Sequence, residues 1–305
     1  MTATLDRPQR TSDERPALRH RLAERGIDRV LLLLVPGVLF VVVLFVYPVF
    51  YGLQLSFQPR DGGGPLANYG KFFSDSYLYD TIWITLRLAL PAALINVLAS
   101  VPIAYRMRGR FRGKRLVTTI LVIPITLGTV LTAEGLIEYL GPVGWLNKIL
   151  LWLHLIDQPI RFVHSYLGVL LSLVITGFPF AFLLTLSYLS GIDPTLEQAA
   201  ATLGADWRHR FTRITLPLLA PGLAITFCLT FVLAFSVFPS AYLVGLPQGG
   251  TRVISIAAYE AAFRDIDYPL GSAIAMIMAV VMLAVIGLVL AWRSTLYRGA
   301  TGGKG

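Results

Sequence analysis

Six apolar segments, each long enough to cross a bilayer, constrain this chain more than any other feature. The first, residues 30–50, contains no charged residue over a length that spans roughly 30 Å of hydrocarbon as a helix. Only 14% of all residues are charged, against about 25% in an ordinary soluble domain. We therefore predict an all-α integral membrane protein with about six transmembrane helices. The other five predicted spans are residues 81–105, 116–139, 165–189, 222–244 and 270–292.

Lys and Arg residues are unevenly divided between the two sides that six spans create. Nineteen of the 26 lie in the two tails and in residues 106–115 and 190–221, whereas the loops on the other side hold six. Cytoplasmic segments of membrane proteins carry such an excess of basic residues. We therefore predict cytoplasmic tails at 1–29 and 293–305 and a membrane domain at 30–292 with a cytoplasmic loop at 190–221. The net charge of +9 then reflects topology, and no nucleic-acid partner is expected.

The predicted cytoplasmic loop carries signals for two short helices. Asp193 and Pro194 are suited to the N-cap and the first position of one helix, and Gly204 is suited to its C-terminal end. Asp206 can cap a second helix, in which Trp207, Phe211 and Ile214 share one apolar stripe. The two prolines that follow, Pro217 and Pro221, are expected to turn the chain back into the membrane.

The spacing within this loop is more specific than its composition. Gln198, Ala199 and Ala200 are followed after three residues by Gly204, and nine residues later by Ile214, Leu216 and Pro217. A solvated basic loop is the simple alternative, because charge runs usually face water. The register nevertheless resembles the signature of permease subunits of binding-protein-dependent ABC importers, which reads Glu-Ala-Ala, three residues, Gly, nine residues, Ile-x-Leu-Pro.

This resemblance implies a type I importer permease bundle of about six helices in a bacterial inner (plasma) membrane. In that family the loop forms a coupling helix that docks into a separate ATPase, so the ATPase-coupling residues here would be Glu197, Gln198, Ala199, Ala200, Gly204, Ile214, Leu216 and Pro217. The implied partners are a second permease subunit, forming a homodimer or a heterodimer, two ABC ATPases, an extracytoplasmic solute-binding protein and membrane lipid. ATP and magnesium would be used by the ATPase, and no cofactor is expected in this chain.

The chain has no nucleotide-binding motif of its own. The nearest match to a P-loop, residues 109–115, has three residues between its glycines and lacks Ser or Thr after the lysine. No metalloprotease, hydrolase or paired-cysteine motif occurs in the sequence either. We therefore expect a transport component and not an enzyme. A channel, a receptor and a membrane enzyme are the rival classes, and none of them calls for an alanine-rich loop in this register.

One position departs from the family pattern. Gln198 stands where the signature has a carboxylate, and Glu197 lies one residue before it. Neighbouring residues on a helix differ in direction by about 100°, so Glu197 is not expected to replace the missing acid. Either the amide is sufficient for docking, or this subunit makes the weaker contact in an asymmetric pair.

Three ionisable residues inside the spans are candidates for the substrate pathway. Arg87 lies in the second span, and Glu134 and Glu138 lie one helical turn apart in the third. Such groups are costly to keep within a membrane, which favours a functional role for them. The structural alternative is an ion pair, or glutamates that reach the outer interface. The polar span residues Asn96, Thr176, Thr226, Thr230 and Ser236 are expected mainly to make contacts between helices.

Smaller features complete the expected architecture. Residues Trp145, Ile149, Trp152 and Leu153 are at helical spacing, which predicts a short helix at the outer membrane interface. Pro102, Pro124 and Pro179 are expected to kink their helices. The residues after 217 resemble the spermidine and putrescine permease branch, and the two glutamates favour a cationic solute. A sugar or glycerol-phosphate permease is the alternative.

Overall fold

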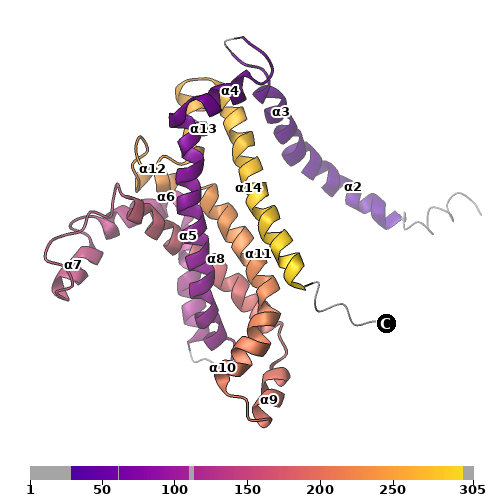
Figure 1. Ribbon diagram of the computed structural model, residues 1–305, viewed down its shortest axis with the longest axis vertical. Helices are drawn as coiled ribbons and strands as arrows, with labels where there is room; N and C mark the ends of the chain where they lie inside the picture. Colours follow the sequence, from indigo (N-terminus) through magenta and orange to yellow (C-terminus); the bar gives the residue numbers. More distant parts are fainter. Residues whose placement is uncertain (1–28, 61, 110–112, 298–305) are drawn as a thin grey trace, which may run out of the picture. The chain divides into compact units, whose positions relative to one another are not determined.

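The computed structural model describes residues 29–60, 62–109 and 113–297 (Figure 1). Within these ranges the chain is helical and contains no strand, which confirms the predicted all-α class. Six helical segments are long and apolar enough to cross a membrane, as the sequence predicted. They are Leu34–Ser56, Ser76–Met107, Lys114–Trp152, Tyr166–Ser190, Trp207–Phe235 and Tyr268–Arg293.

The chain forms two compact units. Unit 1 is Met1–Gly52, and its described part is one apolar helix made of α2 (Arg29–Val41), the π segment η1 (Val42–Val46) and the start of α3 (Tyr47–Ser56). From Leu34 to Tyr51 nearly every side chain of this helix is exposed in the single chain. Unit 2, Leu53–Gly305, is a helical bundle and contains every site described below.

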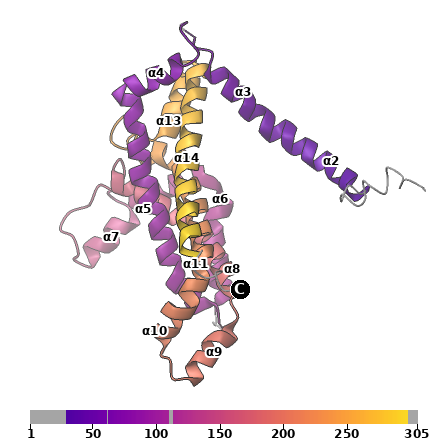
Figure 2. The same ribbon diagram turned by 45° about the vertical axis from the view of Figure 1, so that its right-hand side comes forward.

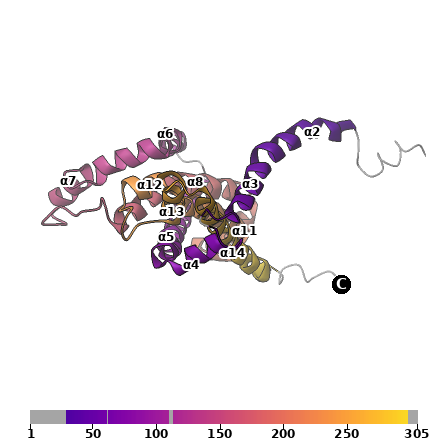
Figure 3. The same cartoon turned by 90° about the horizontal axis from the view of Figure 1, so that it is seen from above.

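Three long helices form the centre of the bundle. Helix α5 (Ser76–Met107) packs along α8 (Tyr166–Ser190), and α11 (Leu216–Phe235) packs against both. Helix α6 (Lys114–Leu140) contacts α8, and α14 (Tyr268–Tyr297) contacts α11. The view from above shows α6 on one side of these three helices and α14 on another (Figure 3). The side chains of α6 are largely exposed in the single chain.

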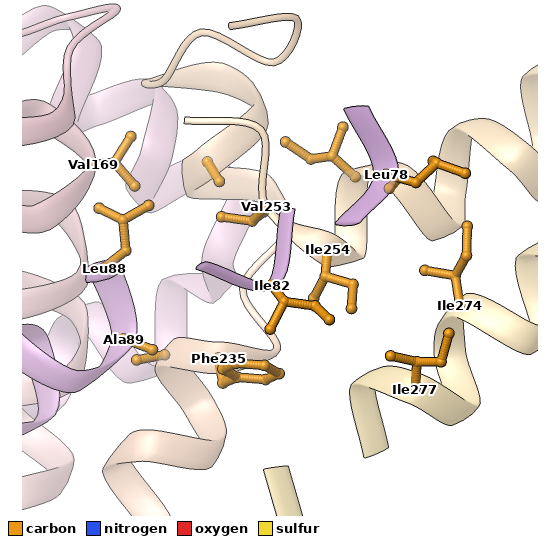
Figure 4. Packing of buried hydrophobic residues seen from close by; sticks show 14 of the residues in the cluster. Leu78, Ile82, Leu88, Ala89, Val169, Phe235, Val253, Ile254, Ile274 and Ile277 are labelled. Atoms are coloured by element: carbon orange, nitrogen blue, oxygen red, sulfur yellow. The ribbon is translucent and has the colours of Figure 1, made fainter. Parts of the chain in front are cut away.

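The main core lies where α5 meets α8, α11, α14 and the short helix α13 (Ile254–Tyr259). Figure 4 shows Leu88 beside Val169 and Ile82 beside Ile254 and Phe235. The alanines of α5 at positions 89, 92 and 93 are fully buried. Small residues let membrane helices approach closely, so these alanines allow the tight packing around α5.

Pairs of short helices lie at the two ends of the bundle (Figures 1 and 2). Helices α9 (Pro194–Thr202) and α10 (Trp207–Arg210) lie at one end, which we call the α9 end. Helices α4 (Ala67–Ser74) and α13 lie at the opposite end, called the α4 end. Helix α7 (Trp145–Trp152) confirms the short helix predicted from the spacing of its tryptophans. The remaining elements are η2 (Phe211–Thr215), α12 (Pro239–Leu243) and η3 (Glu260–Arg264).

The predicted bounds of the fifth span, 222–244, are wrong. Helix α11 ends at Phe235, and at its other end it continues η2 and α10 back to Trp207. Pro217 does not break the helix, because the Leu216 N–H bonds to the carbonyl of Phe211, five residues back, within the π segment. The chain leaves the helix at Ser236–Phe238 instead, and Pro239 then begins the short helix α12.

The expected kink in α6 occurs four residues after Pro124. Gly128 has φ +77° and ψ 168°, a conformation that only glycine adopts readily. The Thr132 hydroxyl donates to the Gly128 carbonyl at 2.6 Å, which pairs a backbone group next to the break. Kinks were also expected at Pro102 in α5 and Pro179 in α8. Neither of these described helices contains a residue with non-helical φ and ψ.

Close packing at the start of α8 yields a first prediction, that Gly168→Ala destabilises the bundle. A Cβ at Gly168 would lie 1.9 Å from the Phe162 carbonyl oxygen, so the backbone must shift. Overpacking of this kind costs about 1–3 kcal/mol. Thermal unfolding in detergent measures the loss. Gly287→Ala is the control, because nothing lies within 4 Å of its Cβ position; equal melting temperatures for the two variants would contradict the prediction.

Candidate functional site

The loop at the α9 end, residues 191–215, has the local structure that its sequence predicts. Asp193 caps α9 by accepting from the Thr195 N–H at 2.9 Å, and Pro194 is the first helical residue. Asp206 caps α10 in the same way through the His209 N–H. These caps pair N–H groups that would otherwise lack partners, so the polar loop is ordered by its own side chains.

Gly204 closes helix α9 in a left-handed conformation. Its φ is +85°, the Gly204 N–H bonds to Ala201, and the Ala205 N–H bonds to Ala200 at 3.0 Å. Together these two bonds form a Schellman motif, in which the last helical carbonyls find partners only if the residue after the C-cap has positive φ. The expected C-terminal role of Gly204 is confirmed.

One face of the loop is exposed. Gln198 and Ala199 lie on it, and Leu203 is 89% exposed in the single chain. Leu196 and Trp207 are also exposed apolar side chains of this loop. A short helix with small residues and a protruding leucine presents a surface that another protein can approach closely, because alanines leave its backbone accessible.

Glu197 lies on the opposite face of α9 and points into the bundle. Its carboxylate forms an ion pair with Arg108, at the end of α5, with Nη1 and Oε1 3.1 Å apart. The hydroxyls of Tyr105, at 3.2 Å, and of Thr215 also donate to it. The side chains of Glu197 and Arg108 are only 12% and 14% exposed. Glu197 therefore joins α9 to the ends of α5 and η2, a contact that the sequence did not predict.

The charge of Glu197 is stabilised in this position. Burial alone raises the pKa of its carboxyl, but the Thr215 hydrogen bond and the Arg108 guanidinium outweigh that effect and hold the pKa below its usual range. The ionised Glu197 side chain therefore stabilises the folded protein in full at any pH above the ordinary carboxylate pKa. This stabilisation is lost only as the pH falls through the lowered pKa of Glu197. At neutral pH the ion pair is fully formed.

The remaining motif residues continue from the loop into α11. Ile214 and Leu216 are partly buried, and Pro217 is exposed. Phe211 packs edge-on against Tyr105, with ring centroids 4.9 Å apart. The sequence pattern Ile-x-Leu-Pro therefore marks the place where the loop joins the long helix.

The structure does not pair the three ionisable span residues with one another. Arg87, on α5, is exposed, and its carbonyl accepts from the Tyr166 hydroxyl at 2.6 Å. Glu134 and Glu138 are exposed on α6. Among the described residues, which include all three, no ion pair joins Arg87 to either glutamate. Their place in a substrate pathway stays a prediction.

A charged cluster at the α4 end was not identified from the sequence. The Arg252 guanidinium bonds to the Glu260 carboxylate at 2.7 Å, lies 3.9 Å from the Tyr77 ring centroid and donates to the Tyr77 carbonyl. A cavity of about 560 Å³ lies beside it, with the Lys71–Asp267 ion pair also on its wall. Tyr77 is far from Arg252 in the sequence, so no local pattern reveals the cluster. The contacts of Arg252 with Glu260 and Tyr77 hold η3, and α13 before it, against the start of α5.

No cluster of three or more His, Cys, Asp or Glu side chains that could hold a metal ion occurs in the part of the chain that the structure describes.

Comparison with known proteins decides the family. Residues 96–297 match the model of the binding-protein-dependent transport system inner membrane component. The chain belongs to this family. The matched residues include the whole loop at the α9 end, the helix that follows it and, from the cluster at the α4 end, Arg252 and Glu260 but not Tyr77. The permease is therefore a membrane transport component of the ABC importer class, as its sequence signature indicated.

Individual relatives of the permease differ in what they carry. It is 29% identical to the spermidine/putrescine transport system permease protein PotB of Escherichia coli K12, over 83% of this chain and 93% of PotB. It is 27% identical to the trehalose transport system permease protein SugA of Mycobacterium tuberculosis H37Rv, over 85% of each chain. A chain of a bacterial alginate ABC transporter, crystallised with an alginate-bound periplasmic protein, superposes with a TM-score of 0.74 at 22% identity, over 89% of this chain and 95% of that chain.

Proposed function

We propose that this permease forms one half of a solute pathway across a bacterial inner membrane and couples it to a separate ATPase through the loop at the α9 end. The observation that carries the proposal is the division of α9 into two faces. Gln198 and Leu203 are exposed for docking, whereas Glu197 binds the ends of α5 and η2. A force applied to the exposed face is thus passed directly to two pathway helices.

The complete transporter would contain this chain, a second permease, two ABC ATPases and an extracytoplasmic binding protein. ATP and magnesium would be bound by the ATPases, so that this chain carries out no chemical step. The orientation that supports this assembly has both tails and the α9 end in the cytoplasm, in agreement with the excess of Lys and Arg residues there. The charged cluster around Arg252 then faces the binding protein.

The proposed solute is a polyamine such as spermidine or putrescine. The relationship to PotB and the resemblance of the residues after 217 to that branch support it. A sugar or glycerol-phosphate solute is the alternative, supported by the similar relationship to SugA. Uptake of radiolabelled putrescine and trehalose by the reconstituted transporter distinguishes the two.

Leu203→Asp tests the docking surface. Because Leu203 is 89% exposed, the substitution leaves the bundle intact but places a charge in the proposed contact. We expect ATPase recovered with the purified permease to fall about tenfold, equivalent to about 1.4 kcal/mol of binding free energy. Val143→Asp is the control, since Val143 is 81% exposed and lies in the turn between α6 and α7. Unchanged ATPase recovery with Leu203→Asp would contradict the proposed docking.

A further inference from the structure

The first half of helix α6 carries an open groove of about 620 Å³ on its surface. The lining begins with two cations, Lys114 and Arg115, continues past Thr119 and reaches the apolar side chains of Val122 and Ile123. Every described residue that lines the groove belongs to α6, so nothing in the single chain covers this face. A surface that is charged at one end and apolar further along matches an amphiphilic ligand.

The two cations at the start of the groove have no acidic partner. Among the residues that the structure describes, no carboxylate lies within ion-pair distance of Lys114 or Arg115. Both belong to the first turn of a helix that is apolar enough to cross a membrane. The first N–H groups of a helix lack helical partners and carry partial positive charge. Side chains and backbone therefore both favour an anion at this end of the groove.

The hydroxyl groups of the groove are divided in the same sense. Thr118 and Thr126 donate to carbonyls of their own helix, each at 2.8 Å, so neither brings an unpaired donor into the hydrocarbon. The exposed Thr119 hydroxyl makes no hydrogen bond within the described part of the chain. Thr119 lies one helical turn from Arg115 on the same face. The groove thus places a free hydroxyl beside its two cations.

The length of the groove corresponds to one leaflet of a bilayer. From Lys114 to Thr126 an α-helix rises about 18 Å, and half of the hydrocarbon core is about 15 Å thick. Val117 and Leu121, on the other side of α6, pack against the core cluster that joins α5 and α8. The groove consequently faces away from the bundle over the depth that one phospholipid occupies.

We propose that this groove binds one anionic phospholipid of the cytoplasmic leaflet. The phosphate accepts from Lys114, Arg115 and Thr119, and an acyl chain lies over Val122 and Ile123. The proposal rests on the orientation given with the proposed function, in which the α9 end and the nearby start of α6 are cytoplasmic. Anionic lipids give the cytoplasmic surface of a membrane its negative potential, and basic pockets at this level bind their head groups.

The second permease of the transporter is the other candidate for covering this face. Its own cytoplasmic boundary is expected to carry an excess of Lys and Arg, which would bring further cations towards Lys114 and Arg115. Tightly packed interfaces between membrane helices are also built mainly from small residues, whereas two long cations and a half-exposed isoleucine border this groove. Charge and side-chain size therefore both favour the lipid.

Lipid binding by the full-length permease in detergent tests the proposal. Phosphatidylglycerol and phosphatidylcholine are added in equal amounts, and native mass spectrometry counts the chains that carry one lipid. We expect Lys114→Gln/Arg115→Gln to lower the phosphatidylglycerol-bound fraction at least fivefold and to leave phosphatidylcholine unchanged. Lys148→Gln/Arg161→Gln is the charge-matched control, since both are exposed cations in the segment between α6 and α8; it should bind as wild type does.

Thr119→Val separates a specific site from general attraction to basic residues, because it removes a donor and no charge. The phosphatidylglycerol-bound fraction should fall about threefold in this variant. Thr126→Val should match wild type, since the Thr126 hydroxyl is already bonded within α6. An unchanged bound fraction in Thr119→Val, or in Lys114→Gln/Arg115→Gln, would overturn the proposal.

A photoreactive side chain identifies the occupant in the assembled transporter. Ile123→p-benzoylphenylalanine, in proteoliposomes that contain phosphatidylglycerol, should add the mass of one phospholipid on illumination. Cross-linking to the second permease, or to neither, would overturn the proposal. These measurements need neither ATP hydrolysis nor uptake. A transporter that binds phosphatidylglycerol in the groove but couples no uptake to ATP hydrolysis would refute the proposed function alone.

Discussion

Gly204→Val is expected to abolish coupled transport while leaving the membrane bundle folded. Gly204 has φ +85°, and nothing lies within 4 Å of the position a Cβ would occupy. The penalty therefore arises entirely from the backbone, where a left-handed conformation costs an L-residue about 1–2 kcal/mol and a β-branched one more. Helix α9 would lose its Schellman bonds, and the docking face would lose its shape. Solute-stimulated ATP hydrolysis by the reconstituted transporter should fall at least thirtyfold.

Gly204→Asn is the matched control for this prediction. Asparagine adopts the left-handed conformation more easily than other side chains, so this variant should retain at least a third of wild-type activity. Comparable activity of the Val and Asn variants would show that the backbone conformation of this residue is unimportant for coupling.

Glu197→Leu is expected to be the other severe variant. It removes the carboxylate that pairs with Arg108 and accepts from Tyr105 and Thr215. The guanidinium is then left largely buried without its partner, which costs about 3 kcal/mol for a buried pair and less here because of residual exposure. We expect the α9 loop to become sensitive to protease, and ATP-driven uptake to fall about a hundredfold.

Gln198→Leu is the control for this variant, because it places a similar side chain one residue further along α9. Gln198 is exposed, so this substitution should leave protease resistance unchanged, whatever it does to ATPase docking. Glu197→Gln should be intermediate, since an amide keeps the hydrogen bonds and loses the charge. Normal protease resistance in Glu197→Leu would show that the ion pair does not hold the loop.

The sequence predicted those parts of the loop that depend on local chemistry. Asp193, Asp206 and Gly204 act on backbone groups within a few residues of themselves, and all three take the expected roles. The direction of Glu197 was not predictable in this way. Its partners are Arg108 and Thr215, which are distant in the sequence and meet it only after α5 and α11 have packed.

The same distinction explains the other differences. Pro217 and Pro221 suggested that the fifth membrane helix begins after them, but a π segment and an N-terminal position accommodate Pro217 within a continuous helix. The Asn96 amide makes its expected helix contact by donating to α8, but the threonines expected to do the same donate one turn back in their own helices. The position of Arg252 over Tyr77 depends on a contact across the fold.

The uninterrupted run from Trp207 to Phe235 has a mechanical consequence. It comprises 29 residues, which corresponds to a rod about 40 Å long. One end of this rod is capped by Asp206 beside the docking face, and the other end stops at Phe235. Under the proposed function, a displacement of the docking face would therefore be carried along one continuous helix from Trp207 to Phe235, with the π segment Phe211–Thr215 as the place where this helix can bend.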